Sequence, residues 1–244
     1  MMDETMKIFW RLAFEMHSND YLLRQYNPIR EFEGDLVDGA IVDIGCGQSP
    51  FLLPFSGSDR ELIAIDNEQM QLDFLKKRLM QLNPEKSINW NFLNSNFPED
   101  GLPDKRYALM IISDLLHFYS LDDNMKIGKL LAKKSNTGTM IFVRVHSDKY
   151  YANDPGSPDN HDYFKHYFSV PDLQKIFPER EFETIYLSQV TKKYPKEETD
   201  VVSAWAERAL PLQGVTDIDE IEFHKEAYLE QLNTSDLVAI FKKR

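Results

Sequence analysis

Short apolar segments recur along the chain and alternate with longer segments in which apolar residues follow helical spacing. The apolar segments predict seven strands, at Ala40–Ile44, Glu61–Ile65, Ile88–Leu93, Tyr107–Ser113, Thr139–Val145, Phe182–Val190 and Asp236–Phe241. Most of them are apolar on both faces, which is typical of parallel strands covered by helices on each side. The pattern therefore predicts a doubly wound α/β fold with a mostly parallel sheet.

Helical spacing is clearest over Glu68–Leu82, where four leucines share one face before Asn83 and Pro84 end the helix. Other helices are expected at Met6–Met16, Asp20–Tyr26, Asp122–Lys134, Val170–Phe177, Val201–Leu210 and Ile218–Leu232. The expected capping residues are Asp20 for the second helix and the aspartates Asp122 and Asp123 for the helix that they begin.

The 244 residues suit one domain with an elaboration, or one domain and a small cap. The net charge is −12, and a net −7 of it falls between Pro195 and Asn233. We expect an N-terminal helical cap over residues 1–39 and an α/β core over residues 40–194. An acidic helical insertion over residues 195–233 and a terminal strand over residues 234–244, which completes the core sheet, are expected to follow.

Composition limits the classes of function. Binding to a nucleic-acid backbone depends on clustered Lys and Arg, so the charge of −12 argues against a broad interface of that kind. Cys46 is the single cysteine, which excludes a disulfide framework or a thiolate metal cluster within one chain. No apolar run approaches the ~20 residues that span a bilayer, and the first residues are unlike a secretory signal. We therefore expect a cytoplasmic protein without a membrane partner.

The strongest chemical signal follows the first predicted strand, where Gly45, Cys46 and Gly47 come directly after Ile44. Glycines have no Cβ, so the backbone can approach a ligand closely at the end of this strand, where nucleotides bind in doubly wound sheets. Asp66 ends the next strand about twenty residues later, where a carboxylate accepts hydrogen bonds from both ribose hydroxyls. Each signal alone also fits a turn or a solvated helix cap. Together they predict a nucleoside-containing cofactor.

Two cofactor classes fit this pattern, dinucleotides and S-adenosylmethionine (SAM). A dinucleotide site needs a third glycine where Pro50 stands, so that a helix N-terminus can face the pyrophosphate. Pro50 instead suits the first position of a short helix capped by Ser49. Asp43 would repel a pyrophosphate, whereas its carboxylate favours the ammonium and sulfonium groups of SAM. The residues therefore favour SAM over NAD.

The segment Asp43–Gly47 resembles the first motif of class I SAM-dependent methyltransferases, and Asp66 matches the second. The resemblance covers Ala40–Val190 and resumes at the terminal strand. It implies a Rossmann-like methyltransferase fold, with a seven-stranded sheet whose last strand is antiparallel, N-terminal helices and a helical insertion before the last strand.

The resemblance also implies which residues bind the cofactor. Asn96 falls where the family usually has an aspartate that contacts the adenine amino group, and the backbone N–H of Phe97 would face the same ring. Ser113 begins a segment that lines the methionine end. Ser49 and Asn96 depart from the family's usual glycine and aspartate. The implied cofactor-binding residues are Asp43, Gly45, Cys46, Gly47, Asp66, Asn67, Asn96, Phe97 and Ser113.

Asp114 and His117 are the candidate catalytic residues, because they follow the fourth strand where the methyl group is transferred in the family. An imidazole can act as a general base, although His117 equally suits a structural role, and Asp114 suits a turn. Direct transfer needs no metal. Asp122 and Asp123 could suggest a metal site with Asn124, but consecutive residues converge poorly on one ion, so we expect helix caps and no metal.

The segment after the fifth strand is rich in aromatic and polar residues and is expected to bind the methyl acceptor; they are His146, Tyr150, Tyr151, His161, Asp162, Tyr163, His166 and Tyr167. We expect the acidic insertion to cover this acceptor site and exclude water. A small-molecule acceptor is favoured, a protein acceptor is second and nucleic acid is third. The alternative is a non-catalytic SAM-binding module whose acidic insertion binds a partner protein.

Overall fold

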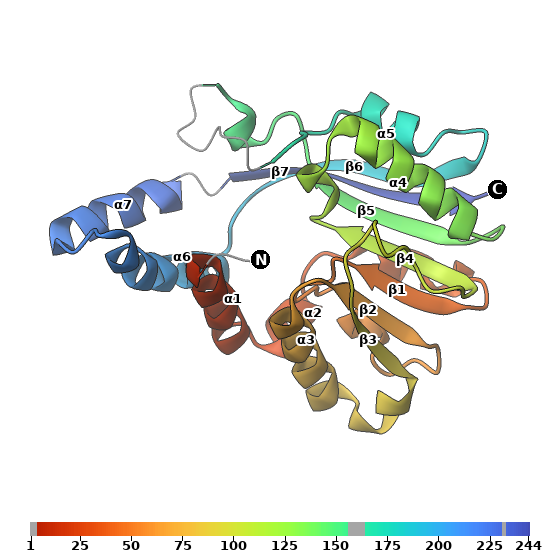
Figure 1. Cartoon of the computed structure of the whole chain (residues 1–244), viewed down its shortest axis with the longest axis horizontal. Helices are drawn as coiled ribbons and strands as arrows, with labels where there is room; N and C mark the ends of the chain where they lie inside the picture. Colours follow the sequence, from red (N-terminus) through yellow and green to blue (C-terminus); the bar gives the residue numbers. More distant parts are fainter. Residues whose placement is uncertain (1–3, 156–163, 231–232) are drawn as a thin grey trace. The chain divides into compact units, whose positions relative to one another are not determined.

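A computed structural model describes residues 4–155, 164–230 and 233–244. Seven strands form one sheet in the order β3-β2-β1-β4-β5-β7-β6 (Figure 1). Their bounds are Ala40–Ile44 for β1, Leu62–Asp66 for β2, Trp90–Asn94 for β3, Tyr107–Ser113 for β4, Met140–His146 for β5, Phe182–Lys193 for β6 and Asn233–Lys243 for β7. The pairs from β3 to β5 are parallel, and β7 runs antiparallel to β5. The predicted seven strands, and the antiparallel last one, are confirmed.

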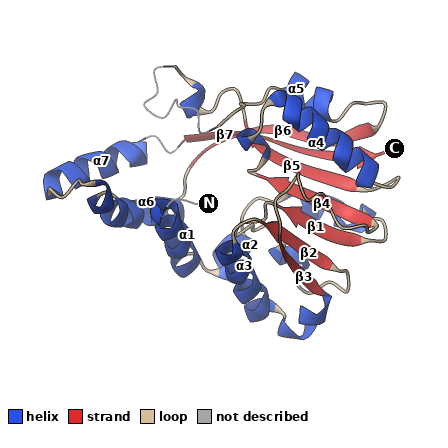
Figure 2. Cartoon of the chain, viewed as in Figure 1, coloured by secondary structure: helices blue, strands red, loops and turns tan. Residues whose placement is uncertain are grey.

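The order of the sheet reverses between β1 and β4, so the carboxyl ends of these two neighbouring strands meet where ligands bind in doubly wound folds. Every residue of β1 and β4 is buried, as their largely apolar sequences predict. Helices α4 (Leu121–Lys134) and α5 (Val170–Ile176) cover one face of the sheet (Figure 2). Helix α3 (Gln69–Leu82) packs against β2 and β3. The strands that carry the predicted cofactor residues are therefore held rigidly.

Two predicted helix caps are wrong. Helix α2 (Asn19–Leu23) is capped by Ser18, whose hydroxyl accepts the Tyr21 N–H, and not by Asp20. Helix α4 is capped by Ser120, whose hydroxyl accepts the Asp123 N–H at 3.2 Å. In both cases the serine has the extended backbone that a cap needs, whereas the aspartates already belong to the first turn.

The predicted short helix after Ser49 does not form. The Ser49 hydroxyl accepts the Phe51 N–H at 3.1 Å within a turn, and only a 3-10 turn at Leu53–Phe55 follows. Pro50 and Pro54 lie too close together for a regular helix, because each removes a backbone donor.

The chain forms two compact units. One contains residues 25–190 and 235–244 with the sheet, and the other joins residues 1–24 to residues 191–234. In the second unit, α1 (Glu4–Met16) packs against α6 (Lys196–Ala209) through Leu12, Ala13 and Val201. Residues expected as an N-terminal cap and residues expected as an insertion thus contribute to one helical unit.

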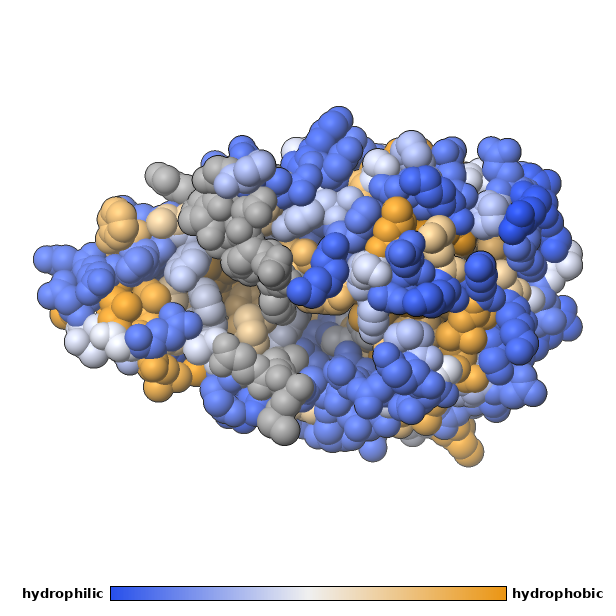
Figure 3. Space-filling model, turned by 45° about the horizontal axis from the view of Figure 1, so that its top comes forward, coloured by the Kyte–Doolittle hydropathy of each residue, from blue (hydrophilic) through white to orange (hydrophobic). Residues whose placement is uncertain are grey.

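The last helix of this unit, α7 (Ile218–Glu230), packs against α6. None of its residues with a described side chain is buried. The exposed apolar residues of the unit include Leu212, Ile218 and Phe223, and hydrophobic surface is visible there in Figure 3. Over the described ranges, no helix has the length and apolar character to cross a membrane.

Candidate functional site

The loop after β1 is shaped by two glycines with left-handed backbone, Gly45 at φ 67° and Gly47 at φ 47°. The N–H groups of Gly45 and Cys46 both donate to the carbonyl of Ile65, at 2.8 and 2.9 Å, which ties the loop to β2. A Cβ on Gly45 would lie 2.9 Å from Leu115, whereas a Cβ on Gly47 would meet no atom within 4 Å. Packing therefore requires glycine at the first position, and the second leaves an open surface that a ligand can approach.

Asp66, at the end of β2, connects this loop to α3. One carboxylate oxygen accepts the Gly47 N–H at 2.8 Å, and the other accepts the Glu68 N–H at 2.9 Å. Burial raises the pKa of Asp66, and these backbone donors oppose that effect. A carboxylate has about four acceptor positions, so Asp66 can still accept hydrogen bonds from a ligand hydroxyl. Asn67 follows it and is exposed.

Asp43 lies directly behind the same loop and is 0% exposed. Neither of its carboxylate oxygens makes a hydrogen bond of good geometry to a described residue. Burial raises the pKa of Asp43 to about 8, an effect that the nearby Ser49 hydroxyl partly offsets. Burial also raises the pKa of the Cys46 thiol, so this cysteine is a packing residue of the loop and not a nucleophile. Asp43 is a buried acid that lacks a cationic partner.

Asn96 and Phe97 follow β3 and lie in a tight turn. The carboxylate of Asp100 accepts the Asn96 N–H at 2.8 Å and the Ser95 hydroxyl at 3.0 Å, which fixes the turn. Phe97 is buried, and its carbonyl accepts the Tyr119 hydroxyl at 2.6 Å. The side chain of Asn96 is exposed, as contact with an adenine ring would require.

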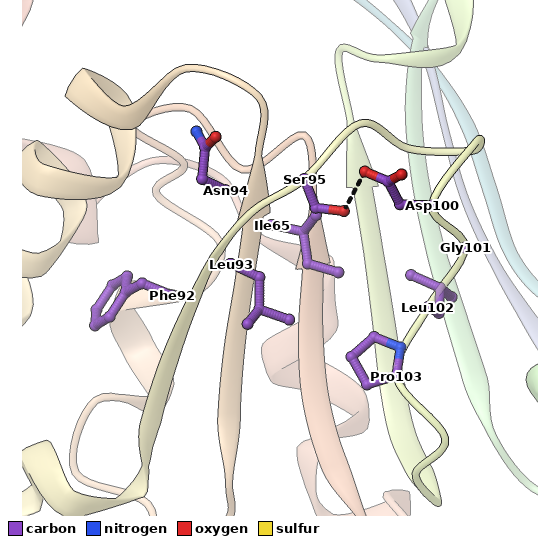
Figure 4. Close-up of a pocket in the computed structure, with 9 residues that line it drawn as sticks. All are labelled: Ile65, Phe92, Leu93, Asn94, Ser95, Asp100, Gly101, Leu102 and Pro103. Carbon is purple, nitrogen blue, oxygen red and sulfur yellow. Dashed lines mark hydrogen bonds between the residues drawn. The ribbon is translucent and has the colours of Figure 1, made fainter.

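A cavity of about 400 Å³ lies beside this turn, at the ends of β2 and β3. Figure 4 shows the loop that follows β3 passing over it, with the hydrogen bond from Ser95 to Asp100 at its rim. Neither Asn96 nor Phe97 lines the cavity; its walls are Ile65, Phe92, Leu93, Asn94, Ser95, Asp100, Gly101, Leu102 and Pro103. The predicted adenine-binding residues are thus adjacent in sequence to residues that line the cavity, but they do not line it themselves.

The second group of candidate residues follows β4 and β5. Asp114 has a left-handed backbone, with φ 56°, and its carboxylate lies 3.3 Å from Arg144 Nε. The same guanidinium nitrogen lies 3.4 Å from the carboxylate of Asp236 on β7. Burial by itself would raise the pKa of Asp114, but Arg144, the imidazoles of His146 and His117 and the Ser113 hydroxyl together lower it. Ser113 donates its hydroxyl to Asp114 at 2.9 Å.

His117 belongs to a stack of rings. Its imidazole lies parallel to that of His146, with centroids 4.1 Å apart and an interplanar angle of 2°. Tyr150 stacks on the other side of His146 at 4.0 Å, and Phe164 meets both histidines edge-on. His117 is 2% exposed, and its Nδ1 has no hydrogen-bond partner among the described residues. Burial lowers the pKa of His117 to about 3, which disfavours the general-base role considered for it.

Of the remaining residues of the predicted acceptor segment, two tyrosines lie near Tyr150 and one histidine lies near α5. Tyr151 and Tyr167 lie near Tyr150, at centroid distances of 4.8 and 6.1 Å. His166 faces Asp172 at the start of α5, with 3.4 Å between Nε2 and the carboxylate. Three predicted members, His161, Asp162 and Tyr163, fall outside the described residues.

Arg144 and Asp236 were not among the predicted site residues. A signal was available, because each is a charged residue within an otherwise apolar strand, and such a charge needs a partner. Within the described residues, no group of three or more His, Cys, Asp or Glu side chains is arranged to hold a metal ion.

No family model matches the sequence, and no curated protein matches it. Solved structures do match the fold. The TM-score with TehB from Haemophilus influenzae is 0.61 at 14% identity, over 93% of this chain and 67% of TehB. With coclaurine N-methyltransferase, bound to N-methylheliamine and S-adenosylhomocysteine (SAH), it is 0.62 at 11% identity, over 92% and 72% of the two chains.

A third similar structure is magnesium protoporphyrin IX methyltransferase from Synechocystis PCC 6803 with bound SAH. Its TM-score is 0.57 at 11% identity, over 100% of this chain and 89% of that one. At these identities the likeness concerns the fold. The chain has the Rossmann-like fold of class I SAM-dependent methyltransferases, as the sequence motifs predict.

Proposed function

We propose that this protein is a SAM-dependent methyltransferase that transfers the methyl group directly to a small molecule. The observation that carries the proposal is Asp43, a fully buried carboxylate with no hydrogen bond of good geometry to a described residue, behind a loop that is open at Gly47. A buried ionised acid is costly unless a cation accompanies it. SAM carries two cationic groups, the ammonium and the sulfonium, so the residues present fit it.

The chain offers a contact for each part of the cofactor. Asp43 would face the methionine end together with Ser113, and the Gly45–Gly47 backbone would follow the nucleoside. Asp66 would accept the ribose hydroxyls, beside Asn67. The adenine ring would meet the turn after β3, where Asn96 is exposed and Phe97 is held by Tyr119; Cys46 packs the loop beneath. SAM itself supplies a methyl group on a positively charged sulfur, which is a good leaving group.

What the chain's own residues do is mainly positioning. The acceptor atom must lie in line with the methyl group, at roughly 3–3.5 Å, which residues after β4 and β5 can enforce. Asp114 is held by Arg144 and would orient the acceptor, and His117 forms part of the aromatic wall. We place the acceptor at this end because β4 lies next to β1 in the sheet and β5 lies next to β4.

Small-molecule acceptors are favoured by two similar structures, one bound to N-methylheliamine and one named for magnesium protoporphyrin IX. The aromatic residues around His146 fit such compounds. A protein acceptor is the second choice, and the charge of −12 disfavours nucleic acid. Cytoplasmic location remains part of the proposal.

Binding tests the cofactor assignment. We expect calorimetry to show that SAM and SAH bind and NAD does not. Asp66→Ala should weaken SAH binding by about 1.5–3 kcal/mol, or roughly 10- to 150-fold, because hydrogen bonds to a charged acceptor are lost. Asp73→Ala is the matched control, since it removes an exposed carboxylate from α3. Equal affinity in both variants contradicts the ribose assignment, and SAM bound without SAH formed from any acceptor supports the non-catalytic alternative.

A further inference from the structure

Resting on the proposed methyltransferase function, we infer that His146, held by Asp236, is the general base that removes a proton from the acceptor. Nδ1 of His146 lies 2.9 Å from the carboxylate of Asp236, a residue that is 2% exposed. Since an ionised carboxylate only accepts, Nδ1 carries the hydrogen in this pair. The lone pair of the neutral ring is then on Nε2.

Nε2 is available to a ligand. It makes no hydrogen bond to a described residue, and it is not fully buried, since the ring keeps 11% of its surface exposed. His117, in contrast, is 2% exposed, and its Nδ1 is sealed without a partner. Of the two stacked histidines, His146 is therefore the one with an oriented ring and an open nitrogen.

Aromatic and charged groups surround the His146 ring. Its ring lies between the faces of His117 and Tyr150, at 4.1 and 4.0 Å. The charged groups nearest to it are Asp236, Arg144 and, beyond the guanidinium, Asp114. Two carboxylates thus face one guanidinium beside the His146 ring.

The location also suits transfer. His146 ends β5, and only β4 separates β5 from β1, whose carboxyl end carries the cofactor loop. Phe164 meets His146 edge-on at 4.9 Å, so the ring lies in aromatic surroundings that fit a planar acceptor. The acceptor class that needs such a base is one whose nucleophilic oxygen still holds its proton at neutral pH, as in a phenol.

In the step, Nε2 takes the proton of the acceptor hydroxyl while its oxygen bonds to the methyl carbon. The carbon–sulfur bond breaks with its electron pair going to sulfur, and the imidazolium later returns its proton to water. Asp236 touches neither reactant and acts as a positioning residue that fixes the tautomer.

His146 and Asp236 are also directly paired in the β5–β7 register, so the alternative is a structural role in which the pair only joins the two strands. The variants separate the roles. His146→Asn keeps an N–H donor toward Asp236 but has no base, whereas His146→Ala loses both. Asp73→Asn repeats the Asp236→Asn change at an exposed position of α3.

The assay measures SAH formed from SAM with two probe acceptors at about pH 8.5, where phenol, with a pKa near the tyrosine value of about 10, keeps its proton. The second probe, 4-nitrophenol, is already ionised there. We expect the rate of SAH formation in His146→Ala and His146→Asn to fall about 10²- to 10⁴-fold with phenol and less than tenfold with 4-nitrophenolate. Asp236→Asn should lose much of the phenol rate, and Asp73→Asn should lose none. SAH calorimetry and thermal unfolding confirm that each variant is folded.

A readout independent of activity is ¹⁵N NMR of the histidine rings, which should show His146 protonated on Nδ1 and not on Nε2, and a changed tautomer in Asp236→Asn. Equal losses with both probes, recovery of the phenol rate in His146→Asn, or the opposite tautomer would overturn the inference. So would wild-type protein that binds SAM but methylates neither probe. Failure to bind SAM at all would instead overturn the proposed function.

Discussion

Carboxylates at the same edge of the sheet differ in their partners. At the end of β1, Asp43 has no hydrogen-bond partner among the described residues, and burial raises its pKa to about 8. Beyond β4, Asp114 and Asp236 share Arg144, and Asp236 also pairs with His146. There the pKa of Asp114 is lowered, because Arg144 and the other polar groups around it together outweigh the effect of burial.

The difference indicates how each half of the site is completed. Burying a carboxylate is costly unless a cation or hydrogen bonds compensate. The chain supplies that compensation on the acceptor side, so the side chains there are organised in advance. On the cofactor side it leaves the compensation to a ligand, and a cationic cofactor would favour the ionised form of Asp43.

The largest effect on stability is expected for Arg144→Met, which leaves two acids without their shared cation. We expect a loss of about 3 kcal/mol, the lower end for a broken buried pair, because the Arg144 side chain is still 24% exposed. Urea unfolding measures it. Arg180→Met is the control, since that arginine is 80% exposed in its pair with Glu181. Equal unfolding midpoints for the two variants would show that the cluster is not organised by charge.

Asp43→Asn tests the other half. The folded-state pKa of about 8 exceeds the ordinary 3.8, so folding favours the protonated acid. Wild-type stability should therefore fall as pH rises from about 4 to 8, and the variant should lack this contribution. SAH binding favours the ionised acid through the ligand ammonium, so binding near pH 7 should release a proton and weaken about tenfold in the variant. Calorimetry in buffers of different ionisation enthalpy counts the protons; identical counts in both proteins contradict the assignment.

Replacing residues 211–230 with a short linker removes α7 and keeps α6, which covers Leu12 and Ala13 of α1. Since no described side chain of α7 is buried, the fold should survive, and SAH affinity should stay within a few-fold. If the acidic segment covers the acceptor, as its sequence suggests, methyl transfer should fall about tenfold. Unchanged transfer with loss of a protein partner would identify this segment as an interaction arm.

The smallest effect is expected from EDTA. Direct transfer from a sulfonium needs no metal, and Asp123 is engaged in the first turn of α4 with Ser120 and Lys126. Methyl transfer should therefore be unchanged by the chelator. A loss that magnesium restores would reveal a metal requirement in the acceptor half of the site.

Local signals accounted for most of the fold. The largely apolar strands, the glycines after β1 and the acid that ends β2 can each be recognised from a short stretch of sequence. The sequence pattern alone therefore predicted the sheet and the loop. Helix caps were less predictable, because Ser18 and Ser120 compete with nearby aspartates for the same role. Backbone conformation decides between them.

By itself, the sequence determined the doubly wound sheet, the cofactor loop and the position of Asp66. Only the tertiary structure decided which charges meet. His146 and Asp236 are 90 residues apart, and the antiparallel register of β5 and β7 brings them together. The tertiary structure also buries the His117 ring and leaves the Asp43 carboxylate without a hydrogen bond of good geometry to a described residue. Burial and pairing set the chemistry of a titratable group, and both depend on contacts between strands that are distant in the chain.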